Sequence, residues 1–271
     1  MGLRGGVPVL SARAIYREIR NNDETYRLFC SVAAKGEAQG GWENRRIAAL
    51  TTDDALRQKI LRHGEDEDKH GRLFQALLRK RGLEACEVPF EVDYTLRLER
   101  QGIGLSHARL HRHEPLSDEE VLRYLVHSRV TEQRAHEEIE RQRKLFAEDP
   151  ELGRAVHMIA EDELNHLSYA HEEIARFSAR GYRERIRAML REYALAEIAT
   201  YRDVSLGVMA RMADALGWSR AKRVVLSFGI HAIYAIERLW SWRRMATIEP
   251  PARPGAMAPR MAHANPPAAT V

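Results

Sequence analysis

The chain has 271 residues, 44% of them hydrophobic and 30% charged, which excludes a disordered or fibrous protein. Two cysteines exclude a disulfide scaffold, a cysteine zinc module and an iron–sulfur site, whereas 12 histidines and 39 acidic residues leave imidazole and carboxylate as available metal ligands. The net charge of +4 is spread among interspersed acids and bases, so nucleic-acid binding is not expected.

The first elements in chain order are helical. Residues 1–10 form a predicted N-terminal arm that lacks the apolar core of a signal peptide. A helical region is expected over 11–50, and Thr51-Thr52 is expected to cap a second helix that ends at Gly82. A long connection without predicted helices follows over 83–116.

The second half of the chain repeats this pattern. Ser117 and Glu120 form a capping box that opens a helix ending near residue 146. Pro150 is expected at the first position of the next helix, which ends before Gly181. Two more helices are predicted, over about 182–216 and 220–245, before a Pro/Ala-rich tail over 248–271. The first four helices thus form two hairpins joined by one long crossover.

Two motifs carry the chemistry. Glu67 and His70 are three residues apart, as are Glu163 and His166, so each pair shares one helix face. One such pair is a weak signal, but each is preceded by Asp, and two copies of Asp-Glu-x-x-His occur where chance predicts about 0.05. The repeated motif therefore indicates a metal site with a ligand pair from each hairpin.

The first helix of each hairpin supplies a matching glutamate. Glu37 and Glu132 lie about as far before their turns as Glu67 and Glu163 lie after them, roughly 15 residues or 22 Å. In antiparallel helices such residues lie at one level, and carboxylates on apolar stripes are costly unless they are paired. Four glutamates and two histidines are the ligand set of a dinuclear iron or manganese carboxylate site.

With these residues, the chain resembles the ferritin-like non-haem diiron carboxylate superfamily over residues 11–181. The resemblance implies an all-α fold: a ferritin-like four-helix bundle with one long crossover, extended by two helices over 182–247. It implies two Fe ions, or Mn/Fe, and residues that divide into two ligand triads and two supporting acids. These are Glu37, Glu67 and His70 on one metal, Glu132, Glu163 and His166 on the other, and Asp66 and Asp162 each hydrogen-bonded to the ligand histidine of the opposite motif.

Three further residues are candidates for the site. His63 precedes Glu67 by one turn and His136 follows Glu132 by one turn, so each is a candidate extra ligand, with packing as the alternative. Tyr169 follows His166 by three residues and is a candidate for a hydrogen bond near the metals, or a core residue. Gly36, with the nearby glycines 40 and 41, indicates either space beside the metals or close helix packing.

The expected activity is that of an O2-activating diiron oxidase or oxygenase, such as a monooxygenase, acting on a small organic substrate. No catalytic residue beyond the metal ligands is evident. Because the sequence has no flavin or iron–sulfur signature, electrons are expected to come from a ferredoxin or reductase. The alternatives are a ferroxidase or peroxide-reducing protein, a diiron hydroxylase of RNA, and a non-catalytic bundle. We expect a cytoplasmic protein, with homodimerisation left open. The helix over 220–245 is expected to pack on the bundle rather than on a membrane or a partner.

Overall fold

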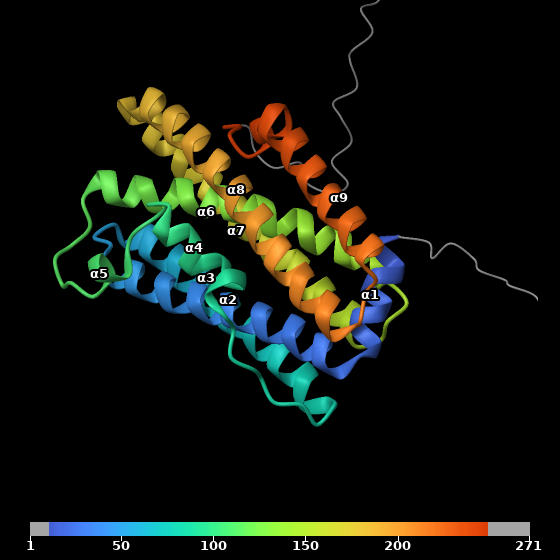
Figure 1. Ribbon diagram of the computed structural model, residues 1–271. Helices are drawn as coiled ribbons and strands as arrows, with labels where there is room; N and C mark the ends of the chain where they lie inside the picture. The colour runs from blue at the N-terminus through green and yellow to red at the C-terminus, as the bar shows by residue number, and fades with distance from the viewer. Residues whose placement is uncertain (1–10, 249–271) are drawn as a thin grey trace, which may run out of the picture.

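The computed structural model describes residues 11–248, and within them every regular element is helical, which confirms the all-α prediction. Figure 1 shows long helices that lie side by side with short helical segments at their margins. The long helices are α2 (Asp23–Leu50), α3 (Asp54–Lys80), α6 (Asp118–Leu145), α7 (Leu152–Phe177), α8 (Arg183–Ala215) and α9 (Arg220–Leu239). The short ones are α1 (Ala12–Asn21), α4 (Tyr94–Arg100), α5 (His107–Leu110) and 3₁₀ turns at Phe90–Val92 and Ser241–Arg244.

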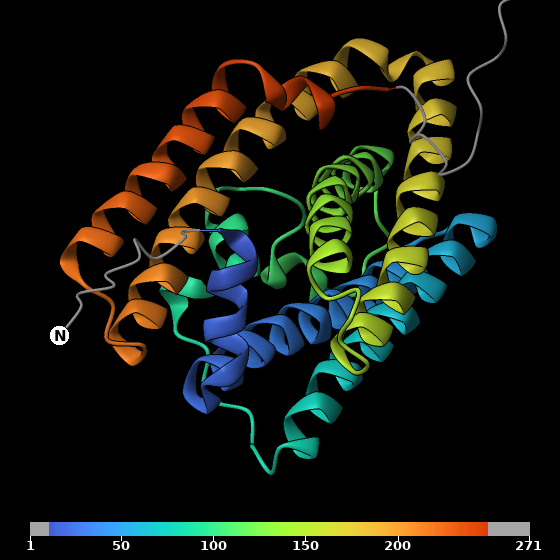
Figure 2. The same ribbon diagram turned by 90° about the vertical axis from the view of Figure 1, so that its right-hand side faces the viewer.

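The predicted hairpins are present. Helix α2 packs along α3, α6 packs along α7, and the two hairpins meet where α3 contacts α7. Seen from the side, α6 lies inside the molecule with α2, α7 and α8 around it (Figure 2). Helix α8 packs on α6, so the chain beyond the two hairpins covers a side of α6 that the hairpins leave open.

Caps fix most helix starts. The capping box of Ser117 and Glu120 is present, and the hydroxyl of Ser219 accepts a hydrogen bond at the start of α9, as predicted. The cap of α3 is Asp53, whose carboxylate accepts from the Leu56 amide at 3.0 Å. Thr51 instead ends α2, with its hydroxyl donating to the carbonyl of Ile47 at 2.8 Å.

Four boundaries differ from the prediction. Pro150 lies before α7 rather than at its first position, and Asp149 Oδ1 accepts from the amides of Glu151 and Leu152 at the helix start. The region 11–50 is two helices, because Asn22 is extended, ends α1 and caps α2. The connection 83–116 holds α4 and α5, each capped by a side chain but too short to give a periodic signal. The last helix stops at Leu239, and a 3₁₀ turn completes the predicted span. The predicted arm 1–10 and the tail from 249 onward lie outside the described residues.

Two apolar cores surround a polar layer. The first core gathers residues near the α2–α3 turn, including Ile60, Leu125 and Ile174. The second gathers residues from the far ends of the same helices, including Phe74 and Ile159. Between the cores, at matching levels of α2, α3, α6 and α7, the helices carry buried Glu and His side chains. The fold therefore places the motif residues in a polar layer between apolar regions.

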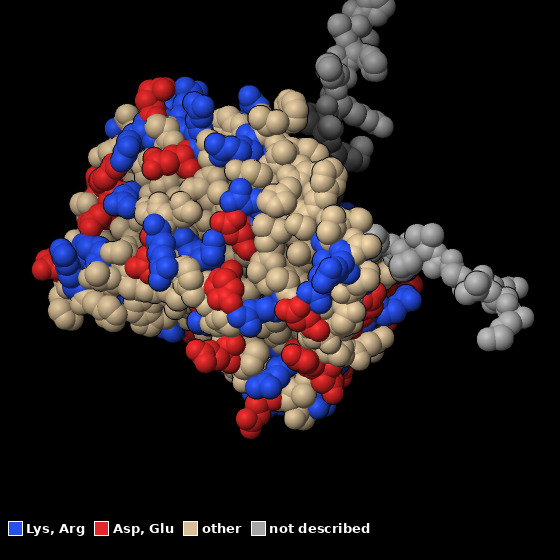
Figure 3. Space-filling view, in the orientation of Figure 1, with Lys and Arg blue, Asp and Glu red and all other residues tan. Residues whose placement is uncertain are grey.

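Helix α9 packs on α8 but remains largely exposed. None of its residues is buried, and Val224, Phe228 and Leu239 present apolar side chains to solvent. Figure 3 shows this apolar surface over α9 beside a surface of mixed charge elsewhere on the same face. The prediction that this helix packs on the bundle thus holds for one side only. Among residues 11–248, no helix is long and apolar enough to cross a membrane.

Candidate metal centre

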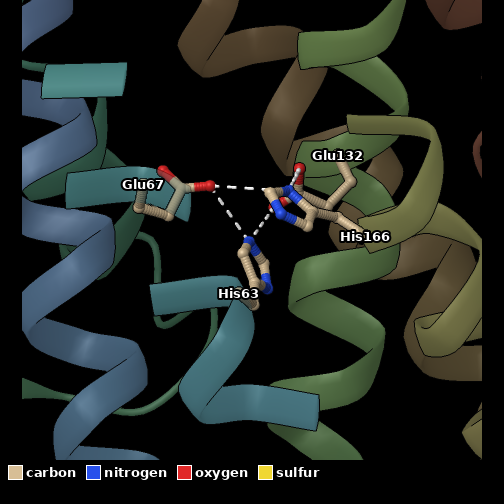
Figure 4. A group of neighbouring side chains, drawn as sticks. All are labelled: His63, Glu67, Glu132 and His166. Atoms are coloured by element: carbon tan, nitrogen blue, oxygen red, sulfur yellow. Dashed lines mark hydrogen bonds and ion pairs between the residues drawn. The ribbon is translucent and has the colours of Figure 1, made fainter. Parts of the chain in front are cut away.

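The polar layer brings the six predicted ligands together from four helices. Glu37 lies on α2, Glu132 on α6, and the two motifs on α3 and α7. Both motif histidines are buried, with exposed fractions of 0% for His70 and 2% for His166. Figure 4 shows that the side chains of Glu67, Glu132 and His166 point toward one another, together with that of His63. Because each helix contributes at one level, residues far apart in the sequence form a single cluster.

Two groups in this cluster could hold a metal ion, since their ligand atoms lie within 4.8 Å of one another. They are Glu37, Glu67 and His70, and His63, Glu67, Glu132 and His166. The first is the triad expected for one metal. The second contains Glu132 and His166 as expected but adds His63 and Glu67. Glu163 belongs to neither group. Its carboxylate lies between the two motif histidines, 3.8 Å from His70 Nδ1 and 3.7 Å from His166 Nδ1.

Buried side-chain atoms without a hydrogen-bond partner indicate whether these residues suit a metal ion. Nδ1 of His70 lies 3.4 Å from Glu37 Oε2, and Nδ1 of His166 lies 3.6 Å from Glu67 Oε1 and 3.7 Å from Glu132 Oε2. Neither nitrogen has a hydrogen-bond partner, and neither does Glu163 Oε2. Buried polar atoms are rarely left unpaired in folded proteins. Imidazole nitrogens facing carboxylate oxygens at this spacing fit bound cations.

The other nitrogen of each motif histidine faces the aspartate of the opposite motif. His70 Nε2 lies 3.0 Å from Asp162 Oδ2, and His166 Nε2 lies 3.5 Å from Asp66 Oδ2. The hydrogen bond that the resemblance implied is therefore present between His70 and Asp162, whereas Nε2 of His166 faces Asp66 without forming one. Lys69, which the sequence reasoning overlooked, lies within ion-pair distance of both aspartates and links the two motifs. An outer carboxylate of this kind fixes the ring orientation and leaves Nδ1 free to bind a metal.

The electrostatics of the cluster favour positive charge. Burial, and then the neighbouring Glu67, raises the pKa of Glu37 well above its usual value. Burial and Glu132 do the same to the pKa of Glu163. Burial alone would lower the pKa of His166, but Asp66 and Glu132 raise it well above its usual value. So many carboxylates in one buried layer need cations, either protons or metal ions, to balance them.

His63 and Tyr169 both belong to the site. His63 Nε2 lies 3.0 Å from Glu67 Oε1 and 3.3 Å from Glu132 Oε1, and its ring stacks on that of His166. On its other side, His63 Nδ1 lies 2.7 Å from Tyr169 Oη. Tyr169 Oη in turn lies 2.7 Å from the hydroxyl of Tyr124, a residue that no sequence motif marked. A hydrogen-bonded chain thus leads away from the cluster.

His136 does not reach the cluster, so its prediction as a ligand is wrong. It lines a hollow on the side of α6 that faces α9, with Ile233 and Glu237 opposite.

The glycines of α2 serve both predicted purposes. A Cβ at Gly41 would lie 3.1 Å from the carbonyl oxygen of Gly64, so α2 and α3 approach closely at this point. A Cβ at Gly40 would lie 3.0 Å from Glu67 Oε2, so this glycine leaves room for the carboxylate. A Cβ at Gly36 would meet no atom within 4 Å. Close packing therefore explains Gly41, and space explains Gly36 and Gly40.

The space beside Gly36 is a cavity of about 360 Å³ against the cluster. Helices α2 and α6 form its walls, α4 and α8 contribute Tyr94 and Tyr201, and Glu37 and Glu132 reach it from the polar layer. Most of its exposed lining is apolar.

No protein family matches the chain, and neither a curated protein nor a solved structure is significantly similar to it.

Proposed function

We propose that the protein is an oxidoreductase of the ferritin-like diiron type, an O2-activating oxidase or oxygenase of a small organic substrate. In this proposal residues 11–181 are the metal-binding bundle and residues 182–247 an extension that closes the substrate cavity. The observation that carries the proposal is the crossed arrangement of the motifs. Each buried histidine turns an unpartnered Nδ1 toward glutamates and its Nε2 toward an aspartate of the other motif.

Iron or manganese suits these ligands, because the site offers carboxylate oxygens and imidazoles and no thiolate. Glu37, Glu67 and His70 would hold one ion, with Glu132 and His166 holding the other. Glu163 is placed to reach both, and His63 is a further donor for the second. Two such ions supply activation of O2 for oxidation when they are bound.

The protein's own residues orient the ligands and exclude water. Asp162 orients the His70 ring by a hydrogen bond, Asp66 faces Nε2 of His166 without one, and Lys69 pairs with both aspartates. The apolar cores above and below the layer keep bulk water from the ligands. The adjacent cavity favours an organic substrate over a ferroxidase that needs only Fe(II) and O2, because such a protein has no use for an apolar space of ligand size. Electrons would come from an external donor.

Metal content tests this function. After anaerobic reconstitution with Fe(II), we expect two irons per chain and a reaction with O2 that changes the visible absorption spectrum. Glu132→Ala is expected to lose at least one iron. Glu161→Ala, an exposed glutamate on α7 with 74% of its side chain accessible, is the control and is expected to retain both. A wild-type protein that holds no transition metal, or equal loss in both variants, would refute the proposal.

A further inference from the structure

The cavity beside the polar layer has a lining that restricts what it can bind. Its volume of about 360 Å³ lies at the small end of the range for ligand pockets. Phe29, Val32 and Ile139 give it apolar walls away from the cluster. The lining therefore suits a small, compact organic molecule.

The charges around the cavity disfavour an anion. Arg134 is the only Lys or Arg among the described residues that line it, and its guanidinium is fully engaged. Glu197 accepts from its Nε and Nη2 at 2.9 and 3.0 Å, and Glu237 accepts from its Nη1 and Nη2, both at 2.9 Å. The lining also holds Glu43 and Glu138, two carboxylates outside the candidate ligand set. An anionic group would thus find no free Lys or Arg among the described wall residues and would meet additional negative charge.

One polar group in the lining is available to a ligand. Ser128 on α6 lines the cavity, is 4% exposed, and its Oγ has no hydrogen-bond partner. A serine inside a helix commonly donates to the carbonyl one turn earlier, as Ser168 does to Leu164 at 2.8 Å. Burying an unpaired hydroxyl is unfavourable, so a hydroxyl left free beside a cavity is suited to a bound molecule.

We propose that this cavity binds a small, mainly apolar organic molecule without negative charge, whose neutral polar group hydrogen-bonds the hydroxyl of Ser128. The inference deepens the proposed function, because it takes the cavity as the substrate site of that metal centre. It assigns Ser128 as a residue that determines specificity.

Three benzene derivatives of similar size test the proposal on the full chain, before and after reconstitution with Fe(II) under anaerobic conditions. Phenol has a neutral hydrogen-bonding group, toluene has none, and benzoate is an anion. In calorimetric titrations we expect phenol to bind most tightly and benzoate at least about tenfold more weakly. Ser128→Ala should weaken phenol binding about two- to tenfold and leave toluene unchanged. The control is Ser31→Ala, a buried serine outside the cavity lining whose Oγ accepts from the Cys86 amide.

A second pair of variants tests whether the cavity is the binding place. Gly36→Leu projects into it without a clash at Cβ and should abolish binding of both phenol and toluene. Gly229→Leu on α9, where Cβ also meets no atom within 4 Å, should bind both normally. Benzoate binding as tight as phenol, or an equal effect of Ser128→Ala on phenol and toluene, would overturn the inference. Iron content is measured separately, so a protein that binds phenol but no iron refutes the proposed function and leaves the cavity assignment standing.

Discussion

Replacing Glu163 by glutamine should separate metal binding from folding stability. The carboxylate is 3% exposed, and its Oε2 has no hydrogen-bond partner. Burial and Glu132 raise its pKa well above the usual value. A carboxyl group with a raised pKa in the folded state contributes stability that is complete at pH values below its unfolded pKa and is lost as the pH rises through the folded pKa. At neutral pH, Glu163 therefore destabilises the metal-free protein.

The size of the effect follows from the burial. Glutamine keeps the shape of Glu163 and can donate to a neighbouring carboxylate, so we expect the metal-free variant to gain about 1–3 kcal/mol. For a protein of this size that raises Tm by about 2–4 °C per kcal/mol. In the wild type, metal at 100 times its Kd adds about 2.7 kcal/mol per site, most of which the variant loses. Glu163→Gln should thus be more stable than the wild type without metal and less stable than the wild type with metal.

Thermal unfolding with and without Fe(II) is the assay, and Glu173→Gln is the matched control. Glu173 is also a buried glutamate of α7, but its oxygens lie 2.8 Å from Lys59 Nζ and 2.6 Å from Arg176 Nη1. Because both partners are partly solvated, its loss should cost about 1 kcal/mol in both states and leave metal content unchanged. The reasoning is refuted if metal-free Glu163→Gln melts below the wild type, or if it keeps the full iron content.

Three further changes have defined outcomes. Asp162→Asn should weaken metal affinity about 10–100-fold, measured by competition with a chelator, because His70 loses its carboxylate partner; unchanged affinity would contradict that role. Gly41→Ala should destabilise the protein by about 1–2 kcal/mol in urea unfolding, since its Cβ would press on a backbone carbonyl of α3; a gain in stability, as expected for alanine in an open helix, would show that the contact relaxes. Arg109 and the capping box lower the pKa of Glu120 to about 2, so its stabilisation is present above about pH 4.5 and lost as the pH falls toward 2. Glu120→Gln should flatten the pH dependence of Tm over that interval, and an unaltered acid transition would argue against the contribution.

The sequence predicted a helix end correctly where residues at that end fix it. The capping box at Ser117 and the positive φ of 66° at Gly82 depend on nearby chain, so the sequence predicted them. The boundary at Asn22 was missed although it carries a local signal, since the Asn22 side chain accepts from the Thr25 amide and Asp23 and Glu24 follow in the first turn of α2. Thr51 and Thr52 were predicted to cap α3, but Asp53, the next residue, accepts the capping hydrogen bond instead.

In the candidate site, too, some residues were predicted from local sequence and others were not. The spacing of Glu67, His70, Glu163 and His166 along two helices placed them on common faces, and the structure brings them together. The same four-residue spacing brought His63 into the cluster but not His136, which lies beside α9 instead. Lys69 lay within the motif but carried no signal, since its role depends on an aspartate 93 positions away.

The sequence by itself determined most of the long helices, their pairing into hairpins and the level at which six ligand residues meet, because helical periodicity and hairpin symmetry are local rules. Only the tertiary structure decided which nitrogen of each histidine faces the glutamates, that His63 joins them, and that α4 and α8 close a cavity against α2. Those features arise where helices distant in sequence pack together, and no periodicity within one helix encodes the orientation of another.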